Sequence, residues 1–504
     1  MKQHWHRKFF TGLSVCAVGS LVCAQNTDRP NILFIMSDDH TSQAISAYGG
    51  MLAPYLPTPN IDRIANEGVR MDNCFVTNSI STPSRACILT GQYSHRNGVY
   101  TLDNSLNINH PTVAKELQKA GYQTAVIGKW HLETEPQGFD YYNVLPGQGR
   151  YKNPELIEKG SWGQVTVHQG HSTDVITDET LKYLKSLDDD KPFFVMCHYK
   201  APHRPWEPAD RFKDLLKEVT IPEPDNMLDH HEGKGEYANN LTMSLEHMDW
   251  NDLKGNMPPD NLGCNDKRHF IYQIYIKDYL RCIAGIDENV GRLLDYLDKN
   301  GLTENTIVVY TGDQGFFLGE HGWFDKRLMY EESLRMPLLI RYPKEIAPES
   351  INTDFVMNID FAPLFLDYAG EPIPDYMQGE SFRKNLTGDT PGDWRTSMYY
   401  RYWMHADWHH NVPGNYGVRT DRYKLIFYYA QPLGMSGARD NPLRPEWELY
   451  DLQEDPAEMN NRYNDPAYGE IIASLKNELL RLKEKYDDKD DKYPVMQEIY
   501  ENYW

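Results

Sequence analysis

The sequence lacks an excess of positive charge, a disulfide framework and, beyond its N-terminus, any long hydrophobic run. Its 51 Lys and Arg residues are outnumbered by 73 Asp and Glu residues, which gives a net charge of −22 and argues against nucleic-acid binding. Two of the seven cysteines lie in the first 24 residues, and the odd number that remains favours free, buried thiols over disulfides. An anionic substrate would therefore have to be met by cations gathered locally.

The first 24 residues have the pattern of a signal peptide. A basic start at residues 2–8 precedes an apolar stretch at 9–22, which is too short and interrupted for a membrane span. The small residues around Ala24 fit cleavage there, and lipidation of Cys23 is the alternative. We therefore expect a secreted or periplasmic protein, with no later membrane span.

Strands and helices alternate along most of the chain, which is typical of α/β proteins whose mostly parallel sheet is covered by helices on both faces. Predicted strands are 31–37, 122–128, 192–199, 305–311 and 337–342, and predicted helices include 112–120 and 272–300. Between them, 205–269 is expected to be a long surface excursion near the substrate.

The pattern of residues along the sequence changes after about residue 390. Segments 398–403 and 417–429 have the pattern of antiparallel strands, and 467–486 that of an amphipathic helix. We therefore predict three parts: a signal peptide (1–24), a catalytic domain (25–389) and a smaller C-terminal α+β subdomain with an antiparallel sheet (390–504).

Polar side chains follow the ends of the predicted strands. In chain order these are Asp38 and Asp39, Lys129 and His131, His203, and Asp313 with Gln314. Ligands of open α/β sheets bind beyond the carboxyl ends of the strands, so these groups are expected to converge. The carboxylates and the amide are hard oxygen donors, which suit Ca²⁺ or Mg²⁺ rather than Zn²⁺.

Several cations could serve a negatively charged transferring group at that place. Lys129 and His131 lie two residues apart in an extended segment and would share a face, and Lys326 follows the strand that ends at Asp313. A single Lys is ordinarily a solvated surface residue and a single His a structural one. It is the convergence of the strand ends that favours a site.

The segment Ser81-Thr82-Pro83-Ser84-Arg85, with Leu89-Thr90-Gly91 beyond it, needs a chemical explanation because an ordinary serine is a poor nucleophile. It resembles the signature of the type I sulfatases of the alkaline phosphatase superfamily, and the resemblance runs from about Pro30 to the segment 448–452. In that family the Cys or Ser is oxidised to Cα-formylglycine, whose hydrate is the nucleophile.

The resemblance assigns roles to particular residues. It implies that calcium is held by Asp38, Asp39, Asp313, Gln314 and the modified Ser81, and that the sulfate site is lined by Arg85, Lys129, His131, His203 and Lys326. His203 would protonate the leaving oxygen, and His131 would take the proton of the second hydroxyl. Arg85 either binds the sulfate or fixes the oxygens of residue 81.

Two positions depart from the commonest family pattern. Ser81 stands where Cys is usual, which implies an anaerobic, Ser-type formylglycine-generating maturation enzyme as a partner; an engineered Cys→Ser change is the alternative. Gln314 stands where Asn is common, and its extra methylene changes the reach of the ligand.

The resemblance implies a sulfated saccharide as substrate. We favour 4-O-sulfated galactose or N-acetylgalactosamine, with 6-O-sulfated N-acetylglucosamine as the alternative. A phosphoesterase of the same superfamily and an inactive glycan-binding relative are the rival functions. Residues 399–415 are rich in aromatics and His, so His405, His409 and His410 are candidate sugar contacts, unless the segment is only a structural strand and turn.

Overall fold

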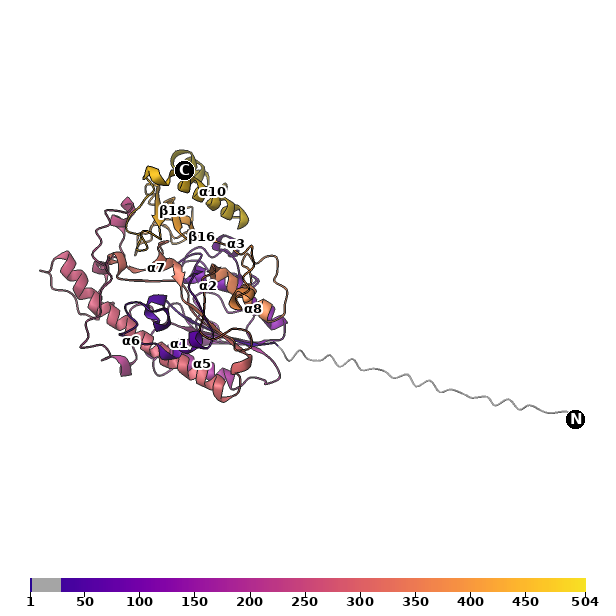
Figure 1. Cartoon of the computed structure of the whole chain (residues 1–504). Helices are drawn as coiled ribbons and strands as arrows, with labels where there is room; N and C mark the ends of the chain where they lie inside the picture. The colour runs from indigo at the N-terminus through magenta and orange to yellow at the C-terminus, as the bar shows by residue number, and fades with distance from the viewer. Residues whose placement is uncertain (2–28) are drawn as a thin grey trace.

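The computed structural model describes Met1 and residues 29–504 (Figure 1). The predicted cleavage at Ala24 and its alternative, lipidation of Cys23, lie outside the described residues. None of the described helices combines the length and the apolar character needed to cross a membrane. The cysteines among the described residues are free, and all of them are buried except Cys264.

The described residues form one large mixed sheet of ten strands. In spatial order these are β14 (Ser350–Asn352), β2 (Val69–Met71), β13 (Leu338–Arg341), β9 (Thr306–Gly312), β1 (Asn31–Ser37), β8 (Phe193–Tyr199), β4 (Gln123–Lys129), β5 (Tyr141–Leu145), β6 (Glu155–Glu158) and β7 (Thr166–Val167). The five central strands from β9 to β5 run parallel, which confirms the predicted core of the sheet. The predicted fifth strand, β13, pairs antiparallel with β9.

Helices cover both faces of this sheet (Figure 1). One face is packed by α1 (Pro59–Asn66), α5 (Ser172–Leu184) and α6 (Cys264–Lys299), and the other by α2 (Ser81–Thr90), α4 (Val113–Lys119) and α8 (Phe361–Tyr368). Strand β1 shows why: Phe34 belongs to one hydrophobic core and its neighbour Ile35 to the other, because successive side chains point to opposite faces. A strand buried on both faces is apolar throughout, as the sequence NILFIMS is.

Shorter elements complete this part of the chain. They are β3 (Cys74–Phe75), β10 (Phe317–Leu318), β11 (Phe324–Asp325), β12 (Arg335–Met336), β15 (Val356–Met357), α3 (Ser94–Asn97), α7 (Glu331–Leu334) and α9 (Arg383–Leu386). Their strands form two small sheets, β12-β3-β15 and β10-β11. The segment 205–263 contains only short 3₁₀ turns, as expected for an excursion, but it is not confined to the surface, because Trp206, Leu245 and Leu253 are buried in the hydrophobic core. Helix α6 begins at Cys264 rather than at residue 272, because its exposed first turn is polar and carries no apolar periodicity.

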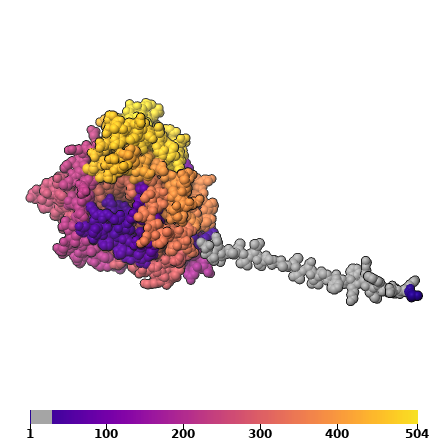
Figure 2. Space-filling model, in the orientation of Figure 1, coloured from indigo at the N-terminus to yellow at the C-terminus, as the bar shows by residue number. Residues whose placement is uncertain are grey.

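The C-terminal region folds as a four-stranded antiparallel sheet packed by α10 (Gly469–Lys485), with α11 (Pro494–Tyr503) after it. Its strands are β16 (Ser397–Tyr402), β17 (Asn415–Thr420), β18 (Tyr423–Tyr428) and β19 (Glu446–Asp451). The range 417–429 therefore holds most of two strands, β17 and β18, separated by a tight turn at Asp421 and Arg422. This region forms the yellow cap of the molecule in Figure 2. The domain boundary predicted at about residue 390 stays a prediction.

Gly128, directly before Lys129 in β4, has a backbone that only glycine adopts at low cost. Its φ is +98°, and a Cβ atom added there would lie 1.9 Å from the carbonyl oxygen of His198 on the neighbouring strand. We expect Gly128→Ala to lower the free energy of unfolding by about 3 kcal/mol, the sum of a left-handed backbone and an overpacked contact.

Chemical denaturation monitored by fluorescence measures this loss. Gly121→Ala is the matched control, since Gly121 has a φ of +89° but space around its Cβ position. This variant should lose only about 1 kcal/mol. Equal losses in the two variants would show that the β4–β8 contact is not the constraint.

Candidate active site

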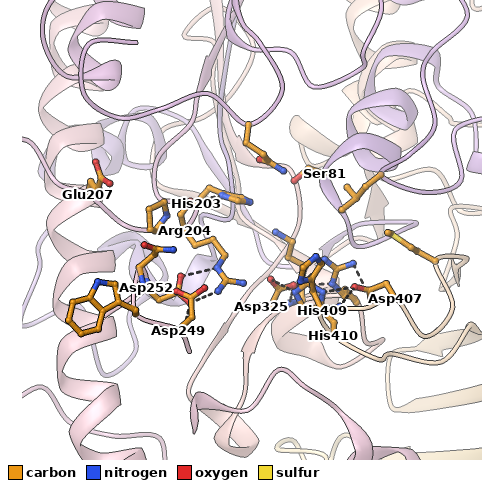
Figure 3. Close-up of a pocket in the computed structure, with 18 of the residues that line it drawn as sticks. Ser81, His203, Arg204, Glu207, Asp249, Asp252, Asp325, Asp407, His409 and His410 are labelled. Atoms are coloured by element: carbon orange, nitrogen blue, oxygen red, sulfur yellow. Dashed lines mark hydrogen bonds and ion pairs between the residues drawn. The ribbon is translucent and has the colours of Figure 1, made fainter. Parts of the chain in front are cut away.

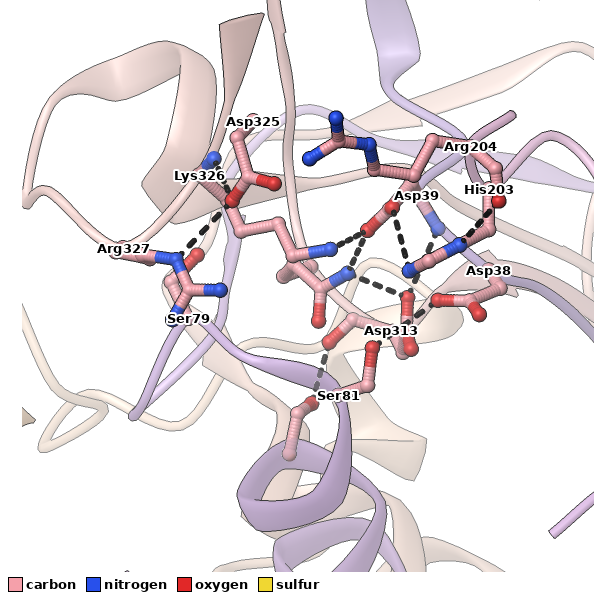
Figure 4. Close-up of polar contacts among 12 residues, drawn as sticks. Asp38, Asp39, Ser79, Ser81, His203, Arg204, Asp313, Asp325, Lys326 and Arg327 are labelled. Atoms are coloured by element: carbon pink, nitrogen blue, oxygen red, sulfur yellow. Dashed lines mark hydrogen bonds and ion pairs between the residues drawn. The ribbon is translucent and has the colours of Figure 1, made fainter. Parts of the chain in front are cut away.

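The functional groups meet at the carboxyl edge of the parallel strands, in front of the N-terminus of α2 (Figure 4). Asp38 follows β1, Lys129 ends β4, and Asp313 follows β9, and these three strands are near neighbours in the sheet. Ser81 is the first residue of α2, and its hydroxyl donates to Asp38 Oδ1 at 3.1 Å. Residues from distant parts of the sequence thus share one site, as the strand-end pattern predicts.

Three carboxylates are packed together in the interior of this site. Asp38, Asp39 and Asp313 are each at most 1 % exposed, and the backbone N–H of Asp39 donates to Asp313 Oδ1 at 3.1 Å. Burial, with neighbouring carboxylates, raises the pKa of Asp39 to about 6 although Lys326 opposes the shift. Such a cluster requires positive charge next to it.

Protein cations supply part of that charge. Lys129 Nζ contacts Asp38 Oδ2, and Lys326 Nζ lies 2.5 Å from Asp39 Oδ1. Arg85 donates from Nε and Nη2 to Asp313 Oδ2, at 3.2 and 3.0 Å, and from Nη1 to the carbonyl of Lys129 at 2.8 Å. Burial would raise the pKa of Asp313, but the charges of Arg85 and the two lysines hold it below its usual value.

The donor set fits a divalent metal ion. Asp38, Asp39 and His203 each offer a ligand atom within 4.8 Å of the other two. The amide of Gln314 donates to Asp313 Oδ1 at 2.7 Å, while its Oε1 is buried without a partner. A half-turn of the amide would direct this oxygen at the carboxylates, which a hard cation between them would favour.

The Arg85 side chain binds neighbouring protein groups of the site rather than facing its open side. Its guanidinium is 2 % exposed, and its fork is engaged by Asp313 and the Lys129 carbonyl. Of the two predicted roles, sulfate binding would require it to leave these partners. The structure instead shows it fixing Asp313 and the end of β4 one helical turn beyond Ser81.

The two predicted catalytic histidines lie at the same edge. His203 Nδ1 is 2.8 Å from the carbonyl of Arg204, which leaves Nε2 facing Asp39 Oδ2 at 3.8 Å. His131 is buried, and its Nδ1 has no hydrogen-bond partner among the described residues. Burial, followed by the charge of Lys129 and other cations, lowers the pKa of both imidazoles well below its ordinary value.

A pocket of about 750 Å³ opens in front of Ser81 (Figure 3). His203, Arg204, Glu207, Asp249 and Asp252 lie on one side of it, and Asp325, Asp407, His409 and His410 lie on the other. On the second side, His410 bridges the two carboxylates, at 3.2 Å from Asp325 Oδ2 and 2.9 Å from Asp407 Oδ1. The volume of the pocket suits a sugar-sized ligand.

Several pocket residues were not predicted from the sequence. Asp325 and Arg327 flank the predicted Lys326 and are bonded to each other at 3.2 Å, so a charged triplet could have drawn attention to them. Arg204 forms a two-point ion pair with Asp252, which lies in the excursion and carries no motif. Nothing in the sequence indicates that pairing.

The three candidate sugar-binding histidines have different surroundings. His405 is fully buried outside the pocket lining: Nδ1 accepts from Gly414 N at 3.0 Å, and Nε2 lies 2.9 Å from the Asn441 carbonyl. This environment fits a structural role for His405, which was the alternative to a sugar contact. His409 and His410 do line the pocket, and whether they touch a sugar stays a prediction.

A buried carboxylate cluster at the strand ends of a helix-covered sheet, with an activatable residue at a helix N-terminus, defines the alkaline-phosphatase-like hydrolases. The chain belongs to the sulfatase family: the family model "Sulfatase" matches residues 30–371, and "N-sulphoglucosamine sulphohydrolase, C-terminal" matches 319–485. It is a sulfuric ester hydrolase, and the family uses formylglycine and a divalent metal.

Similar proteins cover nearly the whole chain. An N-acetylglucosamine-6-O-sulfatase of Bacteroides thetaiotaomicron is 44 % identical over 95 % of this chain and 91 % of its own length. A human N-acetylglucosamine-6-sulfatase is 28 % identical over 76 % of this chain and 69 % of its own. A structure solved with its substrate D-glucosamine-2-N,6-O-disulfate superposes with a TM-score of 0.83 at 42 % identity, covering 92 % of this chain and all of the other.

The guanidinium of Arg85 binds two groups at once, and this predicts the effect of replacing it with lysine. Because a lysine cannot reach Asp313 and the Lys129 carbonyl together, Arg85→Lys should lower kcat/KM for sulfate-ester hydrolysis about 100-fold, or about 2.7 kcal/mol. Initial rates and thermal unfolding are measured side by side. Arg96→Lys is the control, since Arg96 is half-exposed and pairs only with Asp487; unchanged kinetics in Arg85→Lys would remove the positioning role.

Proposed function

We propose that this protein hydrolyses the 6-O-sulfate ester of N-acetylglucosamine or an N-substituted glucosamine in a sulfated glycan. The observation that carries the proposal is the 44 % identity, over 95 % of the chain, to an N-acetylglucosamine-6-O-sulfatase. The structure solved with a 6-O-sulfated glucosamine supports the same regiochemistry. The comparisons thus support the 6-O alternative better than the 4-O-sulfated galactose preference.

The pocket is compatible with a sulfate on a primary alcohol. Ser81 lines it and is only 2 % exposed, and Asp325, Arg327 and Asp407 line it as well. A 6-O-sulfate is carried on an exocyclic carbon, so the ring stays one bond further from the nucleophile than it would with a ring sulfate. The ring hydroxyls would then meet charged side chains, which form the stronger hydrogen bonds.

The charge balance explains how an acidic protein can bind a sulfate ester. In their charged forms, Asp38, Asp39 and Asp313 are balanced by Arg85, Lys129 and Lys326. A divalent cation held by the carboxylates and Gln314 would give the site a net positive charge. Lys129 and Lys326 would then be free to turn toward the sulfate oxygens, where negative charge develops.

His203 is positioned to serve the leaving oxygen. If its Nδ1–H donates to the Arg204 carbonyl, Nε2 is directed into the pocket and could hold the proton that the sugar oxygen needs. The negative charge of a bound sulfate would favour that protonation, against the burial and the neighbouring cations that lower the pKa of His203. His131, with a free Nδ1, is the candidate acceptor for the return step.

The proposed modified residue and metal are Cα-formylglycine at position 81 and Ca²⁺. Formylglycine would supply a hydrated aldehyde, whose second hydroxyl permits release of sulfate, and Ca²⁺ would favour ionisation of that hydrate. The N-terminus of the ten-residue helix α2 favours negative charge at position 81. We also propose a Ser-type maturation enzyme as partner and export through the N-terminal leader.

A panel of sulfated monosaccharides tests the proposal on protein co-expressed with a Ser-type maturation enzyme. Release of sulfate should be fastest from N-acetylglucosamine-6-sulfate, at least 100-fold slower from galactose-4-sulfate, and undetectable from phosphomonoesters. Intact mass should show the loss of two hydrogens at residue 81, and Ser81→Ala is the inactive control. Fastest turnover of a 4-O-sulfate or of a phosphate ester would overturn the assignment.

Metal binding should stabilise the protein independently of turnover. Adding Ca²⁺ to chelator-treated protein at 100 times its dissociation constant should raise the free energy of unfolding by about 2.7 kcal/mol, because the ion binds only the folded cluster. Thermal unfolding measures the gain, which Gln314→Ala should reduce and Asp313→Asn should remove. Asp210→Asn, on the surface, is the control; an equal gain with both Asp variants would place the ion elsewhere.

A further inference from the structure

A second pocket, of about 820 Å³, has a charge opposite to that of the chain as a whole. Its lining includes six basic residues and three acidic ones, whereas the whole sequence is strongly acidic. The basic residues are Lys152, Lys213, Lys217, Lys254, Lys277 and Arg281. Concentrated positive charge on an acidic protein indicates an anionic ligand.

Three of these cations form no ion pair with any described residue, although the charge of Glu218 acts on Lys277. Lys254 and Arg281 both bind Asp278, at 2.7 and 2.8 Å, and Lys152 lies 3.6 Å from Asp210. For the other three, Lys213, Lys217 and Lys277, the described residues give no ion pair. Lys277 and Arg281 are one turn apart on α6, and burial together with Arg281 lowers the pKa of Lys277.

This basic pocket adjoins the catalytic pocket. Glu207 and Lys254 line both of them. In Figure 3, Glu207 lies at the side of the catalytic pocket opposite Asp407, so the shared boundary is away from the wall formed by Asp325, His410 and Asp407. A chain that leaves the catalytic pocket past Glu207 would therefore enter the basic pocket.

An exposed tryptophan lines the catalytic pocket, close in the chain to the shared Lys254. Trp250 is 65 % exposed and lines the catalytic pocket four residues before the shared Lys254. Its loop is fixed, because Asp249 Oδ1 accepts from the backbone N–H groups of Asn251 and Asp252 at 2.8 and 3.0 Å. An exposed indole on such a loop, beside a polar pocket, offers its face to a sugar ring.

We propose that the protein binds an anionic, sulfated oligosaccharide that extends beyond the catalytic pocket, with a sugar on Trp250 and further sulfate or carboxylate groups at Lys213, Lys217 and Lys277. The inference rests on the proposed function and adds to it: the substrate is a polyanionic glycan chain whose sulfated end enters the catalytic pocket. The chain, and not only its terminal sugar, sets the catalytic efficiency.

The test compares three substrates that share one terminal 6-O-sulfated N-acetylglucosamine: the monosaccharide, a neutral tetrasaccharide, and a tetrasaccharide with sulfates and carboxylates further along. Replacing Lys213, Lys217 and Lys277 with Gln should lower kcat/KM on the charged tetrasaccharide about tenfold, since three exposed ion pairs of modest strength add to that factor. Rates on the other two should stay within twofold. Added salt should abolish the difference.

Trp250→Ala should lower kcat/KM about fivefold more on both tetrasaccharides than on the monosaccharide, with part of the loss restored in Trp250→Phe. The charge control replaces Lys185, Lys299 and Lys384 with Gln. These lysines are exposed, lie outside both pockets and, among the described residues, have no ion pair, so the net charge changes equally.

Failure of this inference differs from failure of the proposed function. If wild-type protein releases sulfate but the two triple variants behave alike on all three substrates, the basic pocket is not a glycan site. If wild-type protein releases no sulfate, the affinity of the wild type and of the triple variants for the charged tetrasaccharide, measured by calorimetry, still tests the inference. Equal affinity would then overturn the inference.

Discussion

The structure depends on the compensation of buried negative charge at one edge of its central sheet. Asp38, Asp39 and Asp313 are held within hydrogen-bonding distance of cations and amides in the interior. Isolated, each would be costly to bury, so the cluster exists only because Arg85, Lys129 and Lys326 reach it. This balance ties β1, β4, β9 and α2 together.

The same balance explains how an acidic protein can act on an anionic ester. Sulfate does not meet the average charge of the surface but a place where lysines already lie against carboxylates, and where a divalent cation would shift the sum to positive. The basic pocket that includes Lys213 and Lys277 likewise differs from the net charge of the chain, with six basic residues and three acidic ones in its lining. Local charge, not net charge, decides which ligand is bound.

Most of the architecture could be predicted from the sequence. The apolar strand 31–37 and the polar residues after each strand indicated a helix-covered, mostly parallel sheet with its site at the carboxyl edge. The structure confirms the sheet and brings these polar residues together at that edge. Elements without a periodic signal were less predictable, namely the exposed start of α6 and the tight turn that divides β17 from β18. His405 was misleading because an aromatic, His-rich segment has the same composition in a core as at a sugar site.

The sequence by itself determined the family, the position of Ser81 and the carboxylates and cations around it, because strand ends and a short motif are local features. Only the tertiary structure decided that Arg85 is engaged by Asp313, that Asp325 and His410 form one wall, and that the excursion 205–263 supplies the other with Asp252 and Trp250. Those contacts join residues far apart in the chain, and they follow from packing and charge pairing in three dimensions, which no local pattern encodes.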